Sequence, residues 1–175
     1  MDWTNYLFGF SGRINRAKIW LFVLIVIGAD IVFGIVFTAV FGLSFLSMMG
    51  AFSGHPGMLF AGGTMAMLGG VLLCVFYVLT LYCGLAVSAK RLHDRNKSAW
   101  WLLLFIVLPV ILSIASLSMR ATDLSSGQMS QSDPISIVLS LVSFAIYIWA
   151  FVELYCLKGT TGANAYGPDP LAGPA

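Results

Sequence analysis

Four long apolar segments constrain the fold of this chain more than any other feature. They lie near Ile19–Leu43, Met65–Ala89, Trp100–Leu117 and Ile135–Leu157, and a helix of roughly 20 apolar residues crosses about 30 Å of hydrocarbon. Only 9% of the residues are charged and 59% are hydrophobic, whereas soluble domains carry about 25% charged residues. The sequence therefore predicts a single all-α membrane domain over residues 1–175, built as a bundle of four transmembrane helices.

The Lys and Arg residues predict the orientation of these helices. Eight of the nine lie in three places: before the first apolar segment, at residues 90–97, and after the fourth segment. Because cytoplasmic segments are enriched in Lys and Arg, both termini and the tail at 158–175 are expected in the cytoplasm. Apolar residues at helical spacing from Trp3 to Phe10 predict a short interfacial helix, which Asp2 is placed to cap.

Small and polar side chains predict how the apolar helices contact one another. Asp30, Gly34, Thr38 and Gly42 follow at four-residue steps, a spacing that allows close helix approach in lipid. Asp30 lies near mid-span, where a carboxylate costs at least about 2.5 kcal/mol and usually faces a partner or water. It is either a proton or cation relay or a structural acid bound to a neighbouring helix. Glu153 is nearer the cytoplasmic end and is expected to pair with a loop arginine.

Three motifs carry a resemblance to a known family. They are Gly12-Arg13-Ile14-Asn15-Arg16 followed by Trp20, Arg91-Leu92-His93-Asp94-Arg95 with Ser98 and Trp100-Trp101, and Gly159-Thr160 followed by Asn164 and Tyr166-Gly167-Pro168-Asp169-Pro170. In this order, over almost the whole chain, they resemble the bacterial inner-membrane family of domain of unknown function 805 (DUF805). The chain departs from the usual pattern at Asn96, where a glycine is common. The resemblance implies a small multi-pass protein of the bacterial cytoplasmic (inner) membrane, and it supplies no activity or catalytic residue.

The three motifs all fall on the predicted cytoplasmic side, so they are expected to form one binding site. Arginine donates paired hydrogen bonds to phosphate, and a helix start offers free N–H groups. The candidate ligand-binding residues are Arg13, Arg16, Arg91, His93, Asp94, Arg95, Ser98, Trp101, Asn164, Tyr166 and Asp169. The alternative is that these charges only anchor the chain and form internal salt bridges, such as Arg91 or Arg95 with Asp94, and Asp169 with a loop arginine.

The predicted function is a non-enzymatic binding or scaffold module that engages anionic lipid headgroups or an acidic or phosphorylated partner. The alternative is an oligomeric ion or small-solute transporter that uses Asp30, and a lipid-modifying enzyme is the weaker hypothesis because no catalytic motif is present. Membrane lipids are the expected partners, with a homo-oligomer or another membrane protein as alternatives. The net charge of +2 is too small to indicate nucleic acid. No metal and no cofactor are expected, since neither the cysteines nor the expected first loop, Ser44–Thr64 with His55, has the spacing of a metal site.

Overall fold

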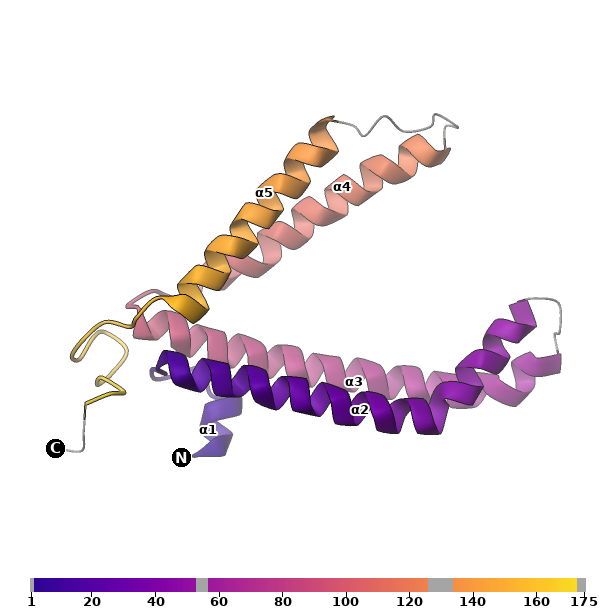
Figure 1. Cartoon of the computed structure of the whole chain (residues 1–175), viewed down its shortest axis with the longest axis horizontal. Coiled ribbons are helices and arrows are strands. Elements are labelled where there is room, and N and C mark those ends of the chain that lie inside the picture. The colour runs from indigo at the N-terminus through magenta and orange to yellow at the C-terminus, as the bar shows by residue number, and fades with distance from the viewer. Residues whose placement is uncertain (1, 53–56, 126–133, 173–175) are drawn as a thin grey trace. The chain divides into compact units, whose positions relative to one another are not determined.

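The computed structural model describes residues 2–52, 57–125 and 134–172, and all regular secondary structure in these ranges is helical. The elements, in chain order (Figure 1), are α1 Trp3–Phe8, α2 Arg16–Phe52, α3 Gly57–Asp94, the π-helical turn η1 Leu103–Val107, α4 Leu108–Ser125, α5 Pro134–Phe151 and the π-helical turn η2 Val152–Cys156. The all-α class predicted from the apolar segments is confirmed.

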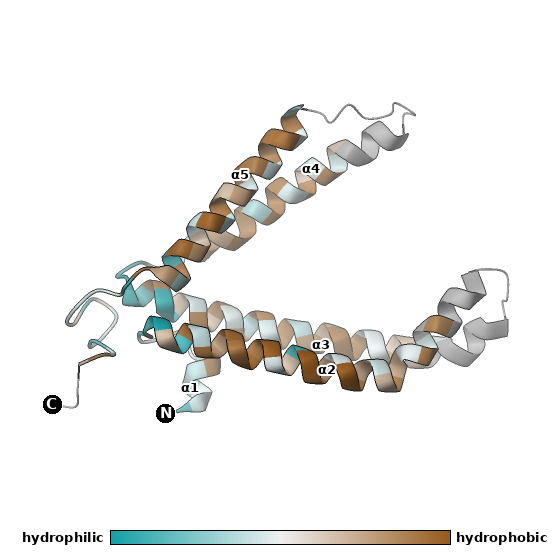
Figure 2. Ribbon diagram, viewed as in Figure 1, coloured by the Kyte–Doolittle hydropathy of each residue, from teal (hydrophilic) through white to brown (hydrophobic). Residues whose placement is uncertain are grey.

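Three helical stretches of the described chain are long and apolar enough to cross a membrane. They are Arg16–Ser44, Met65–Asp94 and Pro134–Cys156, and Leu103–Met119 forms a shorter apolar helix. Figure 2 shows hydrophobic residues along most of their length. The count of four spans and their orientation stay predictions.

The first loop is much shorter than the sequence predicts. Helix α2 continues to Phe52 and α3 begins at Gly57, so the expectation of a loop over Ser44–Thr64 is wrong for most of its length. The segment is rich in Leu, Met and Ala, which are good helix formers, and each glycine costs only about 1 kcal/mol relative to alanine. His55 lies outside the described residues.

The predicted amino-terminal helix is present as α1. Asp2 precedes it, and its Oδ1 accepts hydrogen bonds from the N–H groups of Thr4 (3.1 Å) and Asn5 (3.3 Å), which confirms the predicted cap. Tyr6 is buried, and its hydroxyl donates a 2.5 Å hydrogen bond to the carbonyl of Lys18. This bond joins α1 to the start of α2, while a position of α1 at a membrane interface stays a prediction.

The chain divides into two compact units. The central unit is Leu21–Gly84, which holds most of α2 and α3, and the terminal unit comprises Met1–Trp20 together with Leu85–Ala175. A single membrane domain over residues 1–175 stays a prediction. The three sequence motifs lie within the terminal unit, and Asp30 lies within the central unit.

Aromatic side chains pack α2 against α3 in the central unit. The rings of Phe33 and Phe76 stack with centroids 3.9 Å apart. Gly69 of α3 lies beside the rings of Phe37 and Phe41, and a Cβ atom at this glycine would be only 3.1 Å from the Phe41 ring. The close approach of the two helices therefore depends on one glycine that faces a row of phenylalanines.

The small and polar residues of α2 that repeat at four-residue steps do not form the contact with α3. Asp30, Gly34 and Thr38 are exposed on the central unit and take no part in the contact with α3. Their expected role in helix packing stays a prediction. The phenylalanine row repeats at the same four-residue step and lies about 60° further around the helix, at 100° per residue. Stacked rings bury more apolar area than a small-residue stripe, and they form the α2–α3 contact.

Helices α4 and α5 lie side by side in the terminal unit (Figure 1). Phe105 packs edge-on against Trp149 with centroids 5.4 Å apart. The turn η1, Leu103–Val107, ends two residues before Pro109, which is buried. Pro109 has no N–H to donate to the carbonyl of Phe105, and its ring crowds that carbonyl. A wider π-helical turn accommodates the proline without ending the helix.

Candidate functional site

Hydrophilic residues gather where three segments of the terminal unit meet (Figure 2). The segments are 12–18 before and at the start of α2, 90–98 at the end of α3 and in the following turn, and 157–171 after η2. Hydrogen bonds connect the first segment to the second and both of them to the third. The structure therefore brings the three sequence motifs together.

A buried carboxylate lies at the centre of this cluster. Asp94 ends α3, and its side chain is only 3% exposed. Its Oδ1 accepts hydrogen bonds from Nε (3.2 Å) and Nη2 (3.0 Å) of Arg13, and its Oδ2 accepts one from Nη1 of Arg91. Two arginines thus neutralise one acid, and the predicted salt bridge between Arg91 and Asp94 is confirmed.

Arg13 also binds the carboxyl-terminal segment. Its Nη1 donates to the carbonyls of Gly162 (2.7 Å) and Gly167 (3.2 Å), and its Nη2 donates to the carbonyl of Thr160 (2.6 Å). Both glycines have positive φ angles, 76° and 137°, which side chains other than glycine rarely adopt. These two turns direct backbone carbonyls toward the guanidinium group, so Arg13 is committed to internal contacts.

Arg91 binds the end of the last helix. Its Nε donates to the carbonyl of Leu154 (2.9 Å) and its Nη2 donates to the carbonyl of Leu157. The last carbonyls of a helix have no partner within the helix, and here a buried guanidinium supplies one. Arg91 is fully buried, so its donors serve the fold.

The segment after η2 also packs directly on Asp94. The N–H of Thr160 donates a 2.8 Å hydrogen bond to the backbone carbonyl of Asp94, and its hydroxyl donates another of 3.0 Å. A Cβ atom at Gly159 would lie 1.9 Å from Oδ2 of Asp94. Position 159 therefore requires glycine, because only a residue without a side chain lets the backbone approach the carboxylate this closely.

His93 contacts the carboxyl-terminal turn and forms no acid–base pair with its neighbour Asp94. Its ring stacks on that of Tyr166 with centroids 4.0 Å apart, and its Nδ1 lies 3.3 Å from the carbonyl oxygen of Gly12. The Nδ2 of Asn164 donates a 2.9 Å hydrogen bond to the backbone carbonyl of His93. Asn164 and Tyr166 thus dock the turn onto the end of α3.

A second ion cluster joins the turn after α3 to η2. Glu153 accepts from Nε of Arg95 (2.5 Å) and lies 2.8 Å from Nζ of Lys97. The predicted pairing of Glu153 with a loop arginine is confirmed, whereas its second partner was not anticipated. The ammonium of Lys97 also lies 4.6 Å from the ring centroid of Trp101, a cation–π distance. Ser98 accepts a 3.1 Å hydrogen bond from the N–H of Trp100, at the start of the third apolar helix.

Lys90 has a structural role that the sequence did not indicate. It is buried, and its ammonium donates 2.6 Å hydrogen bonds to the carbonyls of Asn5 and Tyr6 in α1. The charge pattern predicts only that it suits the carboxyl end of α3. Its partners lie more than 80 residues away in the sequence.

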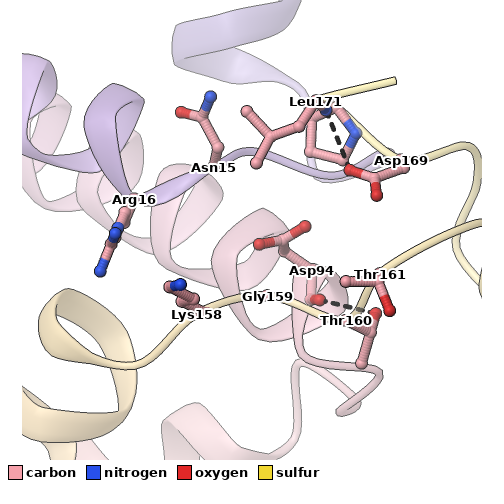
Figure 3. Close-up of a pocket in the computed structure, with 10 residues that line it drawn as sticks. Asn15, Arg16, Asp94, Lys158, Gly159, Thr160, Thr161, Asp169 and Leu171 are labelled. Atoms are coloured by element: carbon pink, nitrogen blue, oxygen red, sulfur yellow. Dashed lines mark hydrogen bonds between the residues drawn. The ribbon is translucent and has the colours of Figure 1, made fainter.

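A cavity of about 340 Å³ opens beside the buried cluster (Figure 3). Its walls are Asn15, Arg16, Asp94, Lys158, Gly159, Thr160, Thr161, Asp169, Pro170 and Leu171. Arg16 and Lys158 are exposed, and within the described part of the chain neither side chain has a hydrogen bond or an ion pair. They are therefore available to a ligand, unlike Arg13 and Arg91.

The carboxylate of Asp169 lines the same cavity. It accepts 2.9 Å hydrogen bonds from the N–H groups of Leu171 and Gly162. These bonds, with the one from Leu171 contributing most, lower the pKa of Asp169, because they stabilise the charged form. The group is thus ionised at neutral pH and held in position.

Three of the predicted ligand-binding residues line the cavity: Arg16, Asp94 and Asp169. The other eight lie outside its walls and make the internal contacts described above. Lys158 and Asn15 were missed as site residues. Asn15 had one readable signal, its position before a helix, and its Oδ1 accepts a 3.0 Å hydrogen bond from the N–H of Lys18 as a helix cap does.

Asp30 lies apart from these residues, in the central unit. It is exposed on α2, beside a shallow groove lined only by α2 residues: Asp30, Ile31, Gly34, Ile35, Thr38 and Ala39. Among the described residues no group of three His, Cys, Asp or Glu side chains is arranged to hold a metal ion.

The chain is similar to proteins found in bacterial inner membranes. The profile of the family "Protein of unknown function (DUF805)" matches residues 7–168. Inner membrane protein YhaH of Escherichia coli K12 is 31% identical over 180 aligned positions, which cover 99% of this chain and 100% of that protein. Uncharacterized protein YiiR and inner membrane protein YhaI of the same strain are each 29% identical, covering 97% of this chain and 90% and 91% of the two proteins. No solved structure matches.

Proposed function

The chain belongs to the DUF805 family, and on that premise we propose that it is a non-enzymatic binding module whose cytoplasmic face holds a phosphate-bearing lipid headgroup. It is a multi-pass protein of the inner membrane, in agreement with its similarity to inner-membrane proteins and with its long apolar helices. Four spans with both termini in the cytoplasm are part of the proposal, and the distribution of Lys and Arg supports them.

The cavity beside Asp94 is the observation that carries this proposal. Two basic side chains without internal partners, Arg16 and Lys158, face it. The acid at its base, Asp94, is already neutralised by two buried arginines. The charged groups that the cavity offers to a ligand are therefore Arg16 and Lys158 on one side and Asp169 on the other, and a phosphate oxygen is the acceptor that suits the two cations.

The position of these cations along the chain favours a lipid over a soluble partner. Arg16 is the first residue of α2, and Lys158 follows η2 by two residues. Both therefore lie where an apolar helix meets its polar flank, at the depth expected for lipid headgroups. A Lys or Arg near an anionic leaflet contributes about 1 kcal/mol to membrane attraction.

Internal contacts account for most of the other positive charge in this cluster, including Arg13, Arg91 and Arg95. The two alternative functions have less support. None of the described residues that line the groove beside Asp30 is basic, so no ion pair of Asp30 within this groove supports the transport alternative. An enzyme would need a poised acid or base, and His93 is stacked on Tyr166 while Asp94 is bound by two arginines.

Lipid retention in native mass spectrometry tests the proposal. Replacing the two cations in the double variant Arg16→Ala/Lys158→Ala should lower retention of phosphatidylglycerol by about twofold to fivefold per cation, the effect of an exposed ion pair. Lys18→Ala is the matched control, because Lys18 lies two residues from Arg16 and does not line the cavity. Equal retention by the wild-type protein and the double variant would contradict the proposal.

A further inference from the structure

The cavity separates its available charges. Figure 3 shows Arg16 and Lys158 on one side and Asp169 on the opposite side. Within the described residues, Asp169 forms no ion pair, although two backbone N–H groups hold its carboxylate in place. Arg13 lies near enough to stabilise the negative charge of Asp169, although it forms no ion pair with it. A purely anionic ligand would add no direct partner for this carboxylate.

The wall residues also restrict which cation would lie beside Asp169. A quaternary ammonium group is recognised by the faces of aromatic rings, and none of the described residues that line the cavity is aromatic. A primary ammonium instead requires hydrogen-bond acceptors, which the carboxylate of Asp169 and the hydroxyl of Thr161 provide. The cavity is also within the size range of small-ligand sites, which begins at about 300 Å³.

We propose that the cavity takes a phosphoethanolamine group, with its phosphate on Arg16 and Lys158 and its primary ammonium on Asp169. This inference rests on the proposed function, because it assigns the chemistry of the ligand at the same site. It adds that a zwitterionic headgroup is preferred over an anionic one, and that Asp169 determines the preference.

Competition between two lipids in native mass spectrometry tests this assignment. The full-length protein is exchanged into mixed micelles that contain equal amounts of phosphatidylethanolamine and phosphatidylglycerol, and the ratio of the two retained lipids is measured. Asp169→Asn should lower this ratio by about twofold to fivefold, since one ion pair is lost. Asp2→Asn is the matched control, because Asp2 caps α1 and does not line the cavity.

Asp169 also accepts hydrogen bonds from two backbone N–H groups, so its substitution can change the local backbone as well as the charge. A variant that keeps the charge separates these two effects. Asp169→Glu should keep a ratio above that of Asp169→Asn, even where both variants retain less lipid in total. Soluble glycerophosphoethanolamine distinguishes the sources of the ligand. If this compound displaces the bound lipid, the protein recognises the headgroup alone. If the compound does not displace it, the protein recognises the intact lipid as a component of the membrane.

The outcomes separate this inference from the proposed function. A ratio unchanged by Asp169→Asn, with retention of both lipids still lowered by Arg16→Ala/Lys158→Ala, would overturn the phosphoethanolamine assignment and leave a phosphate site. Equal ratios in the Asn and Glu variants would overturn it as well. If the double cation variant also had no effect, both proposals would be wrong.

Discussion

At the scale of single residues, arginines with the same charge have different functions in this protein. Arg13 and Arg91 are buried against Asp94 and backbone carbonyls, whereas Arg16 is exposed beside a cavity. Arg95 lies between these cases, with a partly exposed side chain paired to Glu153. A buried ion pair contributes little net stability, but removing one partner costs much more, because it leaves a buried charge unpaired. Burial thus distinguishes arginines of the fold from those that can bind a ligand.

We predict that Arg91→Ala lowers the free energy of unfolding by about 3–5 kcal/mol, the usual cost of removing one partner from a buried pair. Asp94 would keep only Arg13, and the carbonyls of Leu154 and Leu157 would lose their donor. Unfolding by titration with SDS, followed by tryptophan fluorescence, measures the change.

Arg95→Ala is the control for this prediction. Its side chain is 22% exposed, and Glu153 would keep Lys97 as a partner, so the expected loss is at most about 1 kcal/mol. If the two variants lose similar amounts of unfolding free energy, the pairing of Arg91 with buried Asp94 does not stabilise the fold as we propose.

At the scale of helices, the contact between α2 and α3 depends on the shapes of the facing side chains. Phe33 stacks on Phe76, and Gly69 leaves room for the ring of Phe41. In lipid the hydrophobic effect does not drive helices together, so close packing must stabilise the pair. A small residue opposite a large one provides this packing.

We predict that Gly69→Leu destabilises the central unit by about 1–3 kcal/mol, because the larger side chain overlaps the ring of Phe41. Gly70→Leu is a closely matched control. Gly70 is the next residue of α3, is exposed, and has no neighbouring atom within 4 Å of an added Cβ. SDS-titration unfolding compares the two variants, and a loss at position 70 as large as that at position 69 would contradict the packing argument.

At the scale of the whole molecule, positive charge is concentrated in the segments that flank the apolar helices. Six of the Lys and Arg residues of the terminal unit serve the buried cluster (Arg13 and Arg91), the ion cluster at Glu153 (Arg95 and Lys97) and the cavity (Arg16 and Lys158). The same residues give the sequence its positive-inside bias. One set of charges would thus determine orientation during insertion and hold the polar segments together afterwards.

We predict that cysteines introduced at Ser11 and Ala172 react with an impermeant maleimide only after the inner membrane is opened, whereas a cysteine at Ser53 reacts from the outside. Positive-inside bias is the physical reason. Residue 11 precedes Arg13, Arg16 and Lys18, and residue 172 lies in the tail that begins at Lys158 and is predicted on the same side of the membrane. The parent for these variants has its three native cysteines replaced by serine. Labelling of position 11 or 172 in intact spheroplasts would contradict the topology.

The sequence by itself determined the properties that depend on neighbouring residues. Hydropathy located the long apolar helices, and Asp2 marked the start of α1. Asn96, which stands where a glycine is common, adopts a φ of 57°, a conformation that asparagine tolerates. These features arise from local hydrogen bonding and from the length of apolar runs. The motifs also identified the segments that meet, though not their contacts.

Only the tertiary structure decided which charges are paired and which remain available. Arg13 meets Asp94 across 81 residues and Thr160 across 147, separations at which sequence spacing carries no geometric information. Arg16 lies three residues from Arg13, yet it faces the cavity that Lys158 also lines. Pairing depends on distance and burial in the folded chain, because a guanidinium enclosed by carbonyls has no donor left for a ligand, whereas an exposed one has.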